Sequence, residues 1–149
     1  MRRALALLAH DSKKEELVEM IKAHKEELSG LDLVATRDSG QLIQARTGLP
    51  VTLLQSASLG GDLQIGALVA NGEVHSVIFY RDPLKNHSQE TDVFPLLRVC
   101  DIYNVPLATN LGGAEAIIHL LADHPEALSG HYLAAQFLEE TAHNIELNK

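Results

Sequence analysis

The sequence predicts an α/β fold in which five parallel strands form an open sheet with helices on both faces. Short apolar runs alternate along the chain with segments that have the apolar spacing of helices. The connections between them are only a few residues long, which suits right-handed crossovers between parallel strands. With 149 residues and 46% apolar side chains, the chain is long enough for one core and too short for two ordinary domains, so we expect one domain spanning 1–149.

Five apolar runs have the length and composition of strands. The first resembles the start of a signal peptide, but it is too short and leads directly into polar residues from His10, so a core strand is expected. The run that ends at Tyr80 is continuously apolar, which is typical of a strand covered on both faces. The predicted strands are 3–9, 31–35, 51–54, 76–80 and 105–109.

Helix starts and stops lie between these strands. Ser12 and Glu15 form a capping-box pattern before a first helix that ends near Gly30. Gly48 is expected to close a short helix from Gln41, which follows a turn at 36–40. The later helices are predicted from Asp62 to about Ala70, from Asp92 through Ile102, from Asn110 through Leu121, and from His131 to about Asn144.

Charge and cysteine content restrict the partners and the compartment. The formal net charge of −8 argues against nucleic acid or an anionic membrane as a partner, because a polyanion needs clustered cations. No run approaches the ~18 apolar residues needed to span a bilayer. The single cysteine, Cys100, excludes an internal disulfide and lies in an apolar helical pattern, so a buried side chain in a reducing cytoplasm is expected.

The carboxyl ends of parallel strands meet at one edge of a sheet, where ligands bind in such folds. Hydroxyls, exposed N–H groups and helix N-termini at that edge suit a small anion such as phosphate. The residues expected there are His10, Asp11 and Lys14, then 36–39, 56–62, Asp82 and Asn110.

Asp62 is the residue with the strongest chemical interpretation. It follows Gly60 and Gly61 at the start of a helix, so it serves either as the helix N-cap or as a catalytic base. Asp11, Asp82 and Asp92 are predicted nearby. Carboxylates that lie close together repel one another, which raises the pKa of at least one of them and makes it a better base. The alternative is that all four are solvated caps and turn residues.

Other chemistries have less support in the sequence. There is no Walker or dinucleotide fingerprint, so no nucleotide is indicated. None of the eight histidines shows metal-ligand spacing, so no metal is expected. No serine lies in an elbow motif, and Cys100 is predicted to be buried, so no covalent nucleophile is indicated.

Seven short motifs resemble those of one known family. They are Ala9-His10-Asp11 with Lys14, Ala35-Thr36, Gly60-Gly61-Asp62 with Gln64 and Gly66-Ala67-Leu68, Asp82-Pro83-Leu84, Asp92-Val93, Leu97-Arg98 and Pro106-Leu107-Ala108-Thr109-Asn110. Through them the chain resembles the methylglyoxal synthases, from Ala4 to about Ile118. The resemblance implies a flavodoxin-like sheet, usually assembled as a homohexamer.

The resemblance also implies a reaction. It is a glycolytic bypass in which a carbon–oxygen lyase converts dihydroxyacetone phosphate to methylglyoxal and inorganic phosphate without a cofactor. Asp62 would remove a proton next to the carbonyl, while His10, Asp11 and Asp92 would position the substrate and shuttle protons. The residues that would bind substrate and phosphate are Lys14, Thr36, Arg37, Ser39, Ser56, Ala57 and Asp82.

Several positions depart from the family pattern. Gln89 stands where the family has a histidine that polarises the carbonyl, and Ala57 stands where it has a glycine. The phosphate turn contains Arg37 and Asp38, and the family's C-terminal arginine is missing. Two hypotheses remain: a synthase in which Arg37 and Gln89 act as substitutes, or a regulatory module that binds an effector, as this fold does in carbamoyl phosphate synthetase. We favour the synthase, because a module that only binds an effector does not need Asp11, Asp62 and Asp92 together.

Overall fold

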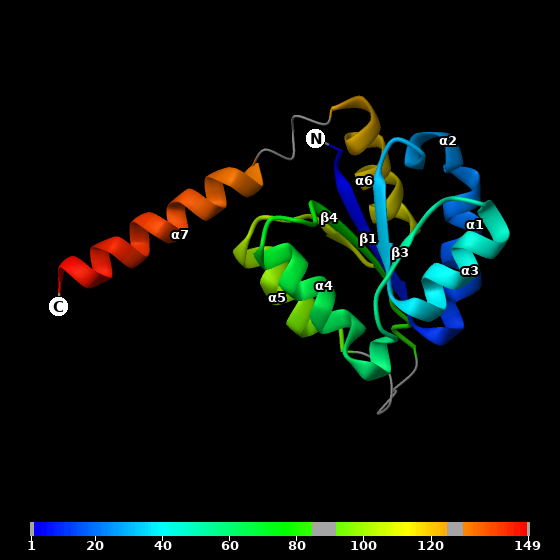
Figure 1. The fold of residues 1–149 in the computed structure, drawn as a ribbon, viewed down its shortest axis with the longest axis horizontal. Coiled ribbons are helices and arrows are strands. Elements are labelled where there is room, and N and C mark those ends of the chain that lie inside the picture. The colour runs from blue at the N-terminus through cyan, green and yellow to red at the C-terminus, as the bar shows by residue number, and fades with distance from the viewer. Residues whose placement is uncertain (1, 85–91, 125–129, 149) are drawn as a thin grey trace.

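The five strands form one sheet in which all neighbouring strands run parallel, as the sequence predicts (Figure 1). A computed structural model describes residues 2–84, 92–124 and 130–148. The strand order is β3-β2-β1-β4-β5, which places β1 at the centre. The strands are β1 (Ala4–Ala9), β2 (Asp32–Ala35), β3 (Thr52–Leu53), β4 (Ser76–Tyr80) and β5 (Leu107–Ala108).

The two edge strands are shorter than predicted. The pairing of β3 with β2 involves only Thr52 and Leu53 of β3, and β5 pairs with β4 only through its two residues. An edge strand has a neighbour on one side only, and Pro50 and Pro106 have no N–H to add to the ladder. The Pro106 carbonyl still accepts a hydrogen bond from the backbone N–H of Val77 at 2.9 Å.

Helices connect the strands as expected, but some begin elsewhere. Thr36 is the extended residue before α3, so the helix starts at Arg37 and the predicted turn at 36–40 is wrong: it is the first helical turn. The capping box at Ser12 is also wrong, because Ser12 lies in η1 and its hydroxyl donates to Asp82 at 2.6 Å. The helices are η1 (Asp11–Lys13), α1 (Lys14–Ala23), α2 (Lys25–Leu28), α3 (Arg37–Thr47), η2 (Ala57–Leu59), α4 (Gly61–Ala70), α5 (Phe94–Ile102), α6 (Leu111–Asp123) and α7 (Gly130–Leu147).

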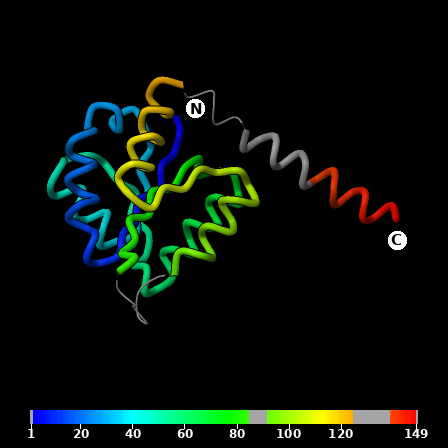
Figure 2. The backbone as a smooth tube through the Cα atoms, turned by 180° about the vertical axis from the view of Figure 1, so that it is seen from behind, coloured from blue at the N-terminus to red at the C-terminus, as the bar shows by residue number. Residues whose placement is uncertain are grey.

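Helices cover both faces of the sheet (Figures 1 and 2), and an apolar cluster lies between each face and its helices. Because side chains alternate along a strand, Leu5 and Leu7 of β1 pack with α1, α3 and α6. Ala6 and Leu8 pack with α4 and α5, together with the fully buried Cys100. All five residues of β4 are buried, as its continuously apolar sequence predicts.

The C-terminal helix α7 is arranged differently from the others. In Figures 1 and 2 it extends away from the sheet and its covering helices. It begins one residue before the predicted start and continues beyond Asn144 to Leu147. In the described part of the chain, α7 and the other helices all lack the length or the apolar content to cross a membrane.

Candidate active site

His10 is the first residue after β1 and is 8% exposed. The backbone N–H of Asp82 donates a hydrogen bond to His10 Nδ1 at 2.9 Å, and the ring packs edge-on against Phe79 with centroids 5.2 Å apart. Since Nδ1 accepts, the proton of the neutral imidazole is on Nε2. The backbone N–H of Asp82, which follows β4, therefore determines the tautomer of His10, and Nε2–H is the donor of this ring.

Lys14 lies at the start of α1 between two carboxylates. Its Nζ is 2.5 Å from Asp11 Oδ1 and 3.8 Å from Asp38 Oδ2, and its side chain is 21% exposed. These pairs join the end of β1 to the start of α3. The cation is thus placed at the strand edge, but an anion that binds to it must share it with Asp38 and Asp11.

The N-terminus of α3 has the features of an anion site. Thr36 and Ser39 are 4% and 1% exposed, and Ser39 Oγ has no hydrogen-bond partner among the described residues. The first N–H groups of a helix lack intrahelical acceptors and lie at the positive end of its dipole. Arg37, on the same turn, is exposed, and its backbone N–H donates to the Gln55 carbonyl at 3.3 Å.

The turn between β3 and α4 lies directly against this helix start. Gly60 has φ +96°, which favours glycine, and a Cβ on Gly61 would overlap the carbonyl oxygen of Gln55 and lie 3.0 Å from Thr36 Cγ2. The Gln64 side chain accepts a hydrogen bond from the backbone N–H of Gln55 at 2.8 Å. Both glycines are therefore needed for the turn to approach α3 closely.

Two further predicted site residues, Ser56 and Ala57, lie in the same turn and are both partly exposed. The Ser56 carbonyl accepts hydrogen bonds from the backbone N–H groups of Leu59 and Gly61, each at 2.9 Å. Ala57 begins η2. The turn thus presents short side chains and helical N–H groups at the strand edge.

Asp62 is the second residue of α4 and is half-buried. Gly60 is the N-cap of that helix, so the interpretation of Asp62 as the cap is wrong. In the described part of the chain, no hydrogen bond or ion pair involves the Asp62 carboxylate. The positive end of the α4 dipole stabilises a negative charge at this position, so the Asp62 carboxylate needs no side-chain partner.

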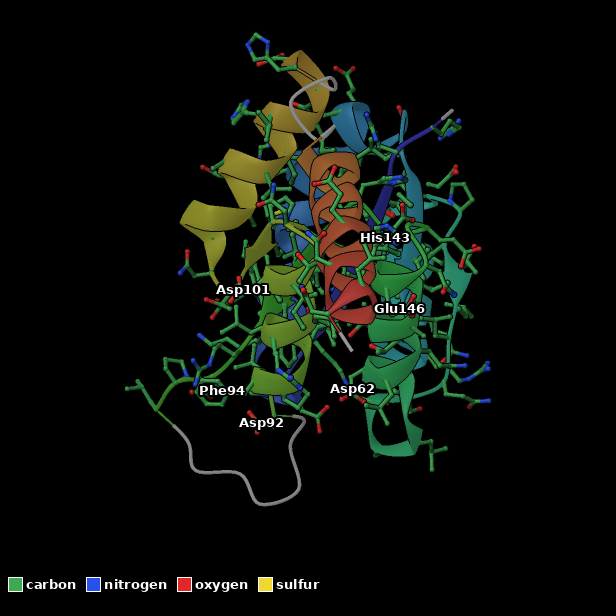
Figure 3. The ribbon with its side chains drawn as sticks, turned by 90° about the vertical axis from the view of Figure 1, so that its left-hand side faces the viewer. Asp62, Asp92, Phe94, Asp101, His143 and Glu146 are labelled. Atoms are coloured by element: carbon green, nitrogen blue, oxygen red, sulfur yellow. The ribbon has the colours of Figure 1, made fainter. Side chains whose placement is uncertain are left out.

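Asp82 and Asp92 both make local backbone contacts. Asp82 accepts hydrogen bonds from Ser12 Oγ at 2.6 Å and from the Leu84 N–H at 3.0 Å, so it connects β4 to η1. Asp92 is exposed, and its Oδ1 accepts from the Phe94 N–H at 3.0 Å at the start of α5. Figure 3 shows Asp62 and Asp92 at the same end of the molecule, near the starts of α4 and α5. Gln89 lies outside the described residues.

Sequence reasoning missed three contacts of this edge: the pairing of Asp38 with Lys14, the bond from Ser12 to Asp82, and the support that Gln64 gives to the turn. Only Gln64 had a local signal, because it lies just after the turn that it supports. Within 2–84, 92–124 and 130–148, no group of three or more His, Cys, Asp and Glu side chains is placed to hold a metal ion.

Comparisons with known proteins agree with this fold. A family model described as an MGS-like domain matches residues 16–109. The methylglyoxal synthase of Moorella thermoacetica is 50% identical over 121 residues, which are 81% of this chain and 94% of the relative. That of Thermus thermophilus is 53% identical over 116 residues, 78% of this chain and 92% of the relative.

A solved structure gives the same result. The crystal structure of methylglyoxal synthase from Elizabethkingia anophelis matches with a TM-score of 0.76 at 36% identity. The match covers 78% of this chain and 77% of that protein. The chain therefore belongs to the methylglyoxal synthase family of lyase enzymes.

Proposed function

We propose that the protein converts dihydroxyacetone phosphate to methylglyoxal and inorganic phosphate, without a cofactor and with Asp62 as the base. The observation that carries the proposal is the Asp62 carboxylate, half-buried and without a partner among the described residues. The preceding residue, Gly61, packs closely against Thr36. Thr36 precedes α3, whose N-terminus suits a phosphate group. A base and an anion site so close together fit a substrate that carries both an acidic C–H and a phosphate.

The phosphate group is assigned to the N-terminus of α3. Ser39 Oγ is buried without a partner in the described residues, and a phosphate oxygen would accept its hydrogen bond. Thr36, the backbone N–H groups of Asp38 and Ser39, and Lys14 complete the donors. Arg37 and the turn at Ser56 and Ala57 border them.

The reaction then needs one proton transfer and one bond cleavage. Asp62 takes a proton from the hydroxyl-bearing carbon next to the carbonyl, and the C–H electrons form an enediolate. His10 donates from Nε2–H to the oxygen on which negative charge develops, as a neutral imidazole can. The electrons of the enediolate then expel phosphate with the C–O bonding pair while the proton of the substrate hydroxyl passes to a carboxylate of the site. The resulting enol aldehyde tautomerises to methylglyoxal. Asp11 and Asp92 are assigned to positioning and proton transfer.

The test of this proposal is Asp62→Asn, with methylglyoxal and phosphate release measured together. An amide of the same shape cannot accept the proton, so turnover should fall by roughly 10²–10⁴ while phosphate binding and the circular dichroism spectrum are retained. Asp32→Asn is the matched control, because Asp32 pairs with Arg2 at the opposite edge of the sheet. A variant at Asp62 that keeps most of its activity removes that residue from the mechanism.

The same assay addresses the effector-binding alternative. If the parent protein binds phosphate but releases neither product from dihydroxyacetone phosphate, the chain acts as a regulatory module and not as a synthase. We also propose a cytoplasmic location, which is supported by the single free cysteine, Cys100.

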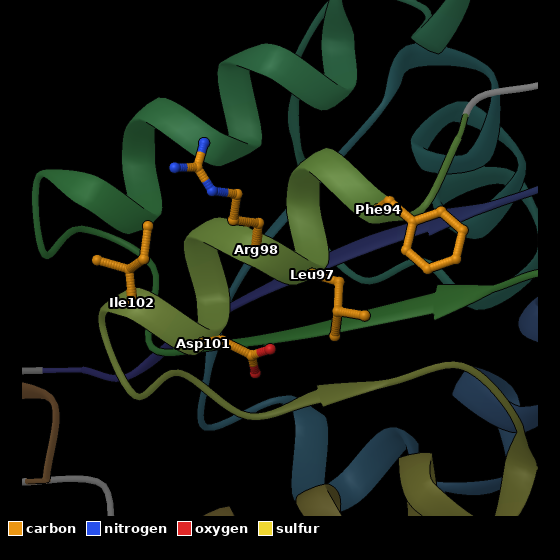
Figure 4. Close-up of a pocket in the computed structure, with 5 residues that line it drawn as sticks. All are labelled: Phe94, Leu97, Arg98, Asp101 and Ile102. Atoms are coloured by element: carbon orange, nitrogen blue, oxygen red, sulfur yellow. The ribbon is translucent and has the colours of Figure 1, made fainter.

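We propose a homo-oligomer as the working form, a hexamer by family resemblance. An apolar surface on α5 supports it: Phe94 and Ile102 are 63% and 41% exposed, and they border a cavity of about 550 Å³ with Leu97 (Figure 4). Arg98 and Asp101 lie on the same surface, so a second copy that packs antiparallel would present opposite charges. Sedimentation equilibrium tests this, and a monomer at working concentration contradicts it.

A further inference from the structure

A second cavity lies at the same edge of the sheet, beside the start of α6. It has a volume of about 310 Å³ and is bordered by Tyr80 at the end of β4, by Lys13 and Glu16 near the start of α1, and by Asn110 before α6. Tyr80 packs in the layer of α1, α3 and α6, but Lys14, Thr36 and Ser39, which are assigned to the substrate phosphate, do not border this cavity. The cavity is therefore separate from the site assigned to the substrate.

Tyr80 gives the strongest indication that this cavity holds a ligand. The residue is 3% exposed, and its hydroxyl has no hydrogen-bond partner among the described residues. A buried hydroxyl left unsatisfied costs roughly 1–3 kcal/mol. Burial, with the nearby charges of Glu16 and Glu115, raises the pKa of Tyr80 to about 12, so the phenol keeps its proton and acts as a donor. An oxygen acceptor placed in the cavity would satisfy it.

The charges around the cavity favour an anion. Arg81 borders it, and no ion pair or hydrogen bond of its guanidinium is found within the described residues. Lys13 also borders it and is paired with Glu16 at 3.1 Å, the one carboxylate of the lining. Glu115 adds a second carboxylate near Tyr80, so Arg81, which pairs with neither carboxylate, is the cation that an anion in the cavity would meet.

The N-terminus of α6 adds backbone donors. Asn110 caps the helix by accepting from the Gly113 N–H at 3.0 Å, and the Asn110 carbonyl accepts from the Ala114 N–H at 2.9 Å. The N–H groups of Leu111 and Gly112 belong to the same first turn and precede those that the cap satisfies. They lie at the positive end of a helix of 13 residues.

We propose that this cavity is a second anion site, which binds a small molecule bearing a phosphate group. Its oxygens accept hydrogen bonds from the Tyr80 hydroxyl, the Arg81 guanidinium and the first N–H groups of α6. A phosphate dianion matches these donors and the two cations better than a neutral ligand does.

Equilibrium dialysis with radiolabelled inorganic phosphate tests the proposal on the intact protein. The parent should bind two phosphates per chain. Arg81→Gln should weaken one of them roughly tenfold, as expected for a lost charge-assisted hydrogen bond, and Tyr80→Phe should weaken the same one by a smaller factor. Tyr80→Phe removes only an unpaired hydroxyl, so thermal unfolding should show a fold at least as stable as the parent.

Two further variants separate this site from the substrate site. Lys14→Ala should weaken only the other phosphate, and Arg46→Gln, which removes an equal charge from a surface pair with Glu15, should change neither. If the parent binds one phosphate that Arg81→Gln weakens and Lys14→Ala does not, the second site is supported and the phosphate assignment of the proposed function fails. Phosphate binding that is insensitive to both Arg81→Gln and Tyr80→Phe overturns the second site.

Discussion

Asp38→Asn should strengthen phosphate binding at the N-terminus of α3. Asp38 is on the first turn of that helix, and its Oδ2 is 3.8 Å from Lys14 Nζ. A phosphate that binds there must share the lysine with this carboxylate and also approach its negative charge. The amide keeps the size and shape of the side chain but removes both effects.

The magnitude follows from the distance and the exposure. At 3.8 Å two unit charges attract by about 1 kcal/mol when water screens them. Strong screening is appropriate because the Asp38 side chain is 61% exposed. Removing the competitor should therefore tighten phosphate binding by about 1 kcal/mol, or roughly fivefold. Asp11, at 2.5 Å from the same lysine, remains in place and limits the gain.

Isothermal titration with inorganic phosphate measures this change. Asp32→Asn removes the same charge at the opposite edge of the sheet and should leave the affinity within the error of the parent value. Losing a carboxylate near a helix N-terminus should lower the free energy of unfolding by about 0.3–1 kcal/mol. Unchanged or weaker phosphate binding in Asp38→Asn would refute the assignment of the anion to Lys14 and α3.

Three more changes test other parts of the molecule. Gln89→His should raise methylglyoxal production about tenfold or more in a coupled turnover assay, because an imidazole both donates and relays protons whereas an amide only donates. Gly61→Ala should lower the free energy of unfolding, measured with urea, by about 2–3 kcal/mol because its Cβ would overlap the Gln55 carbonyl; Gly66→Ala, on the same helix with its nearest neighbour at 3.8 Å, should cause no such loss. With the pKa of Tyr80 raised by burial to about 12 from an ordinary value of 10, the unfolded chain loses this proton first as the pH rises. The Tyr80 contribution, complete below pH 10, should therefore fall by about 1 kcal/mol by pH 11, a loss that urea titrations should show to be absent in Tyr80→Phe.

The layered architecture could be predicted because the central strands and the helices that pack on them bury regular sets of apolar side chains. β4 is buried at all five positions, and its unbroken apolar run is the sequence signature of that environment. Edge strands lack this signal: β3 and β5 are two residues long, and the apolar residues that flank them pack without joining the ladder. The length of each edge strand depends on how many residues pair with the neighbouring strand, and the apolar pattern of the sequence does not show this.

Helix starts were harder to predict because they depend on which partner a polar side chain selects. Ser12 matches a capping box, yet its hydroxyl donates to Asp82, 70 residues away. Thr36 to Gly40 contains typical turn residues, yet Gly40 fits closely between Ala35 and Val51, which lets α3 begin four residues earlier than predicted. In both cases a contact between distant segments determined the local conformation.

The candidate site shows the same division. The edge that gathers its residues follows from parallel topology alone, since each strand delivers its next residues to one side. The protonation and ion pairing of those residues do not follow from topology. The backbone of Asp82 determines which nitrogen of His10 carries the proton, and Asp38, on a different helix, pairs with Lys14. The roles of Asp62 and its neighbours remain predictions that the variants above test.

The adjacent lysines Lys13 and Lys14 border the two sites proposed to bind anions in this acidic chain. In sequence they are one short basic run in a protein with a net charge of −8. In the structure Lys14 pairs with Asp11 and Asp38 toward α3, while Lys13 pairs with Glu16 and borders the cavity at Tyr80. Successive residues on a helix point about 100° apart, so consecutive lysines serve different surfaces. Since salt screens exposed charges beyond about 8 Å, the few groups around each site outweigh the distant carboxylates, and net charge alone is a poor guide to what either site binds.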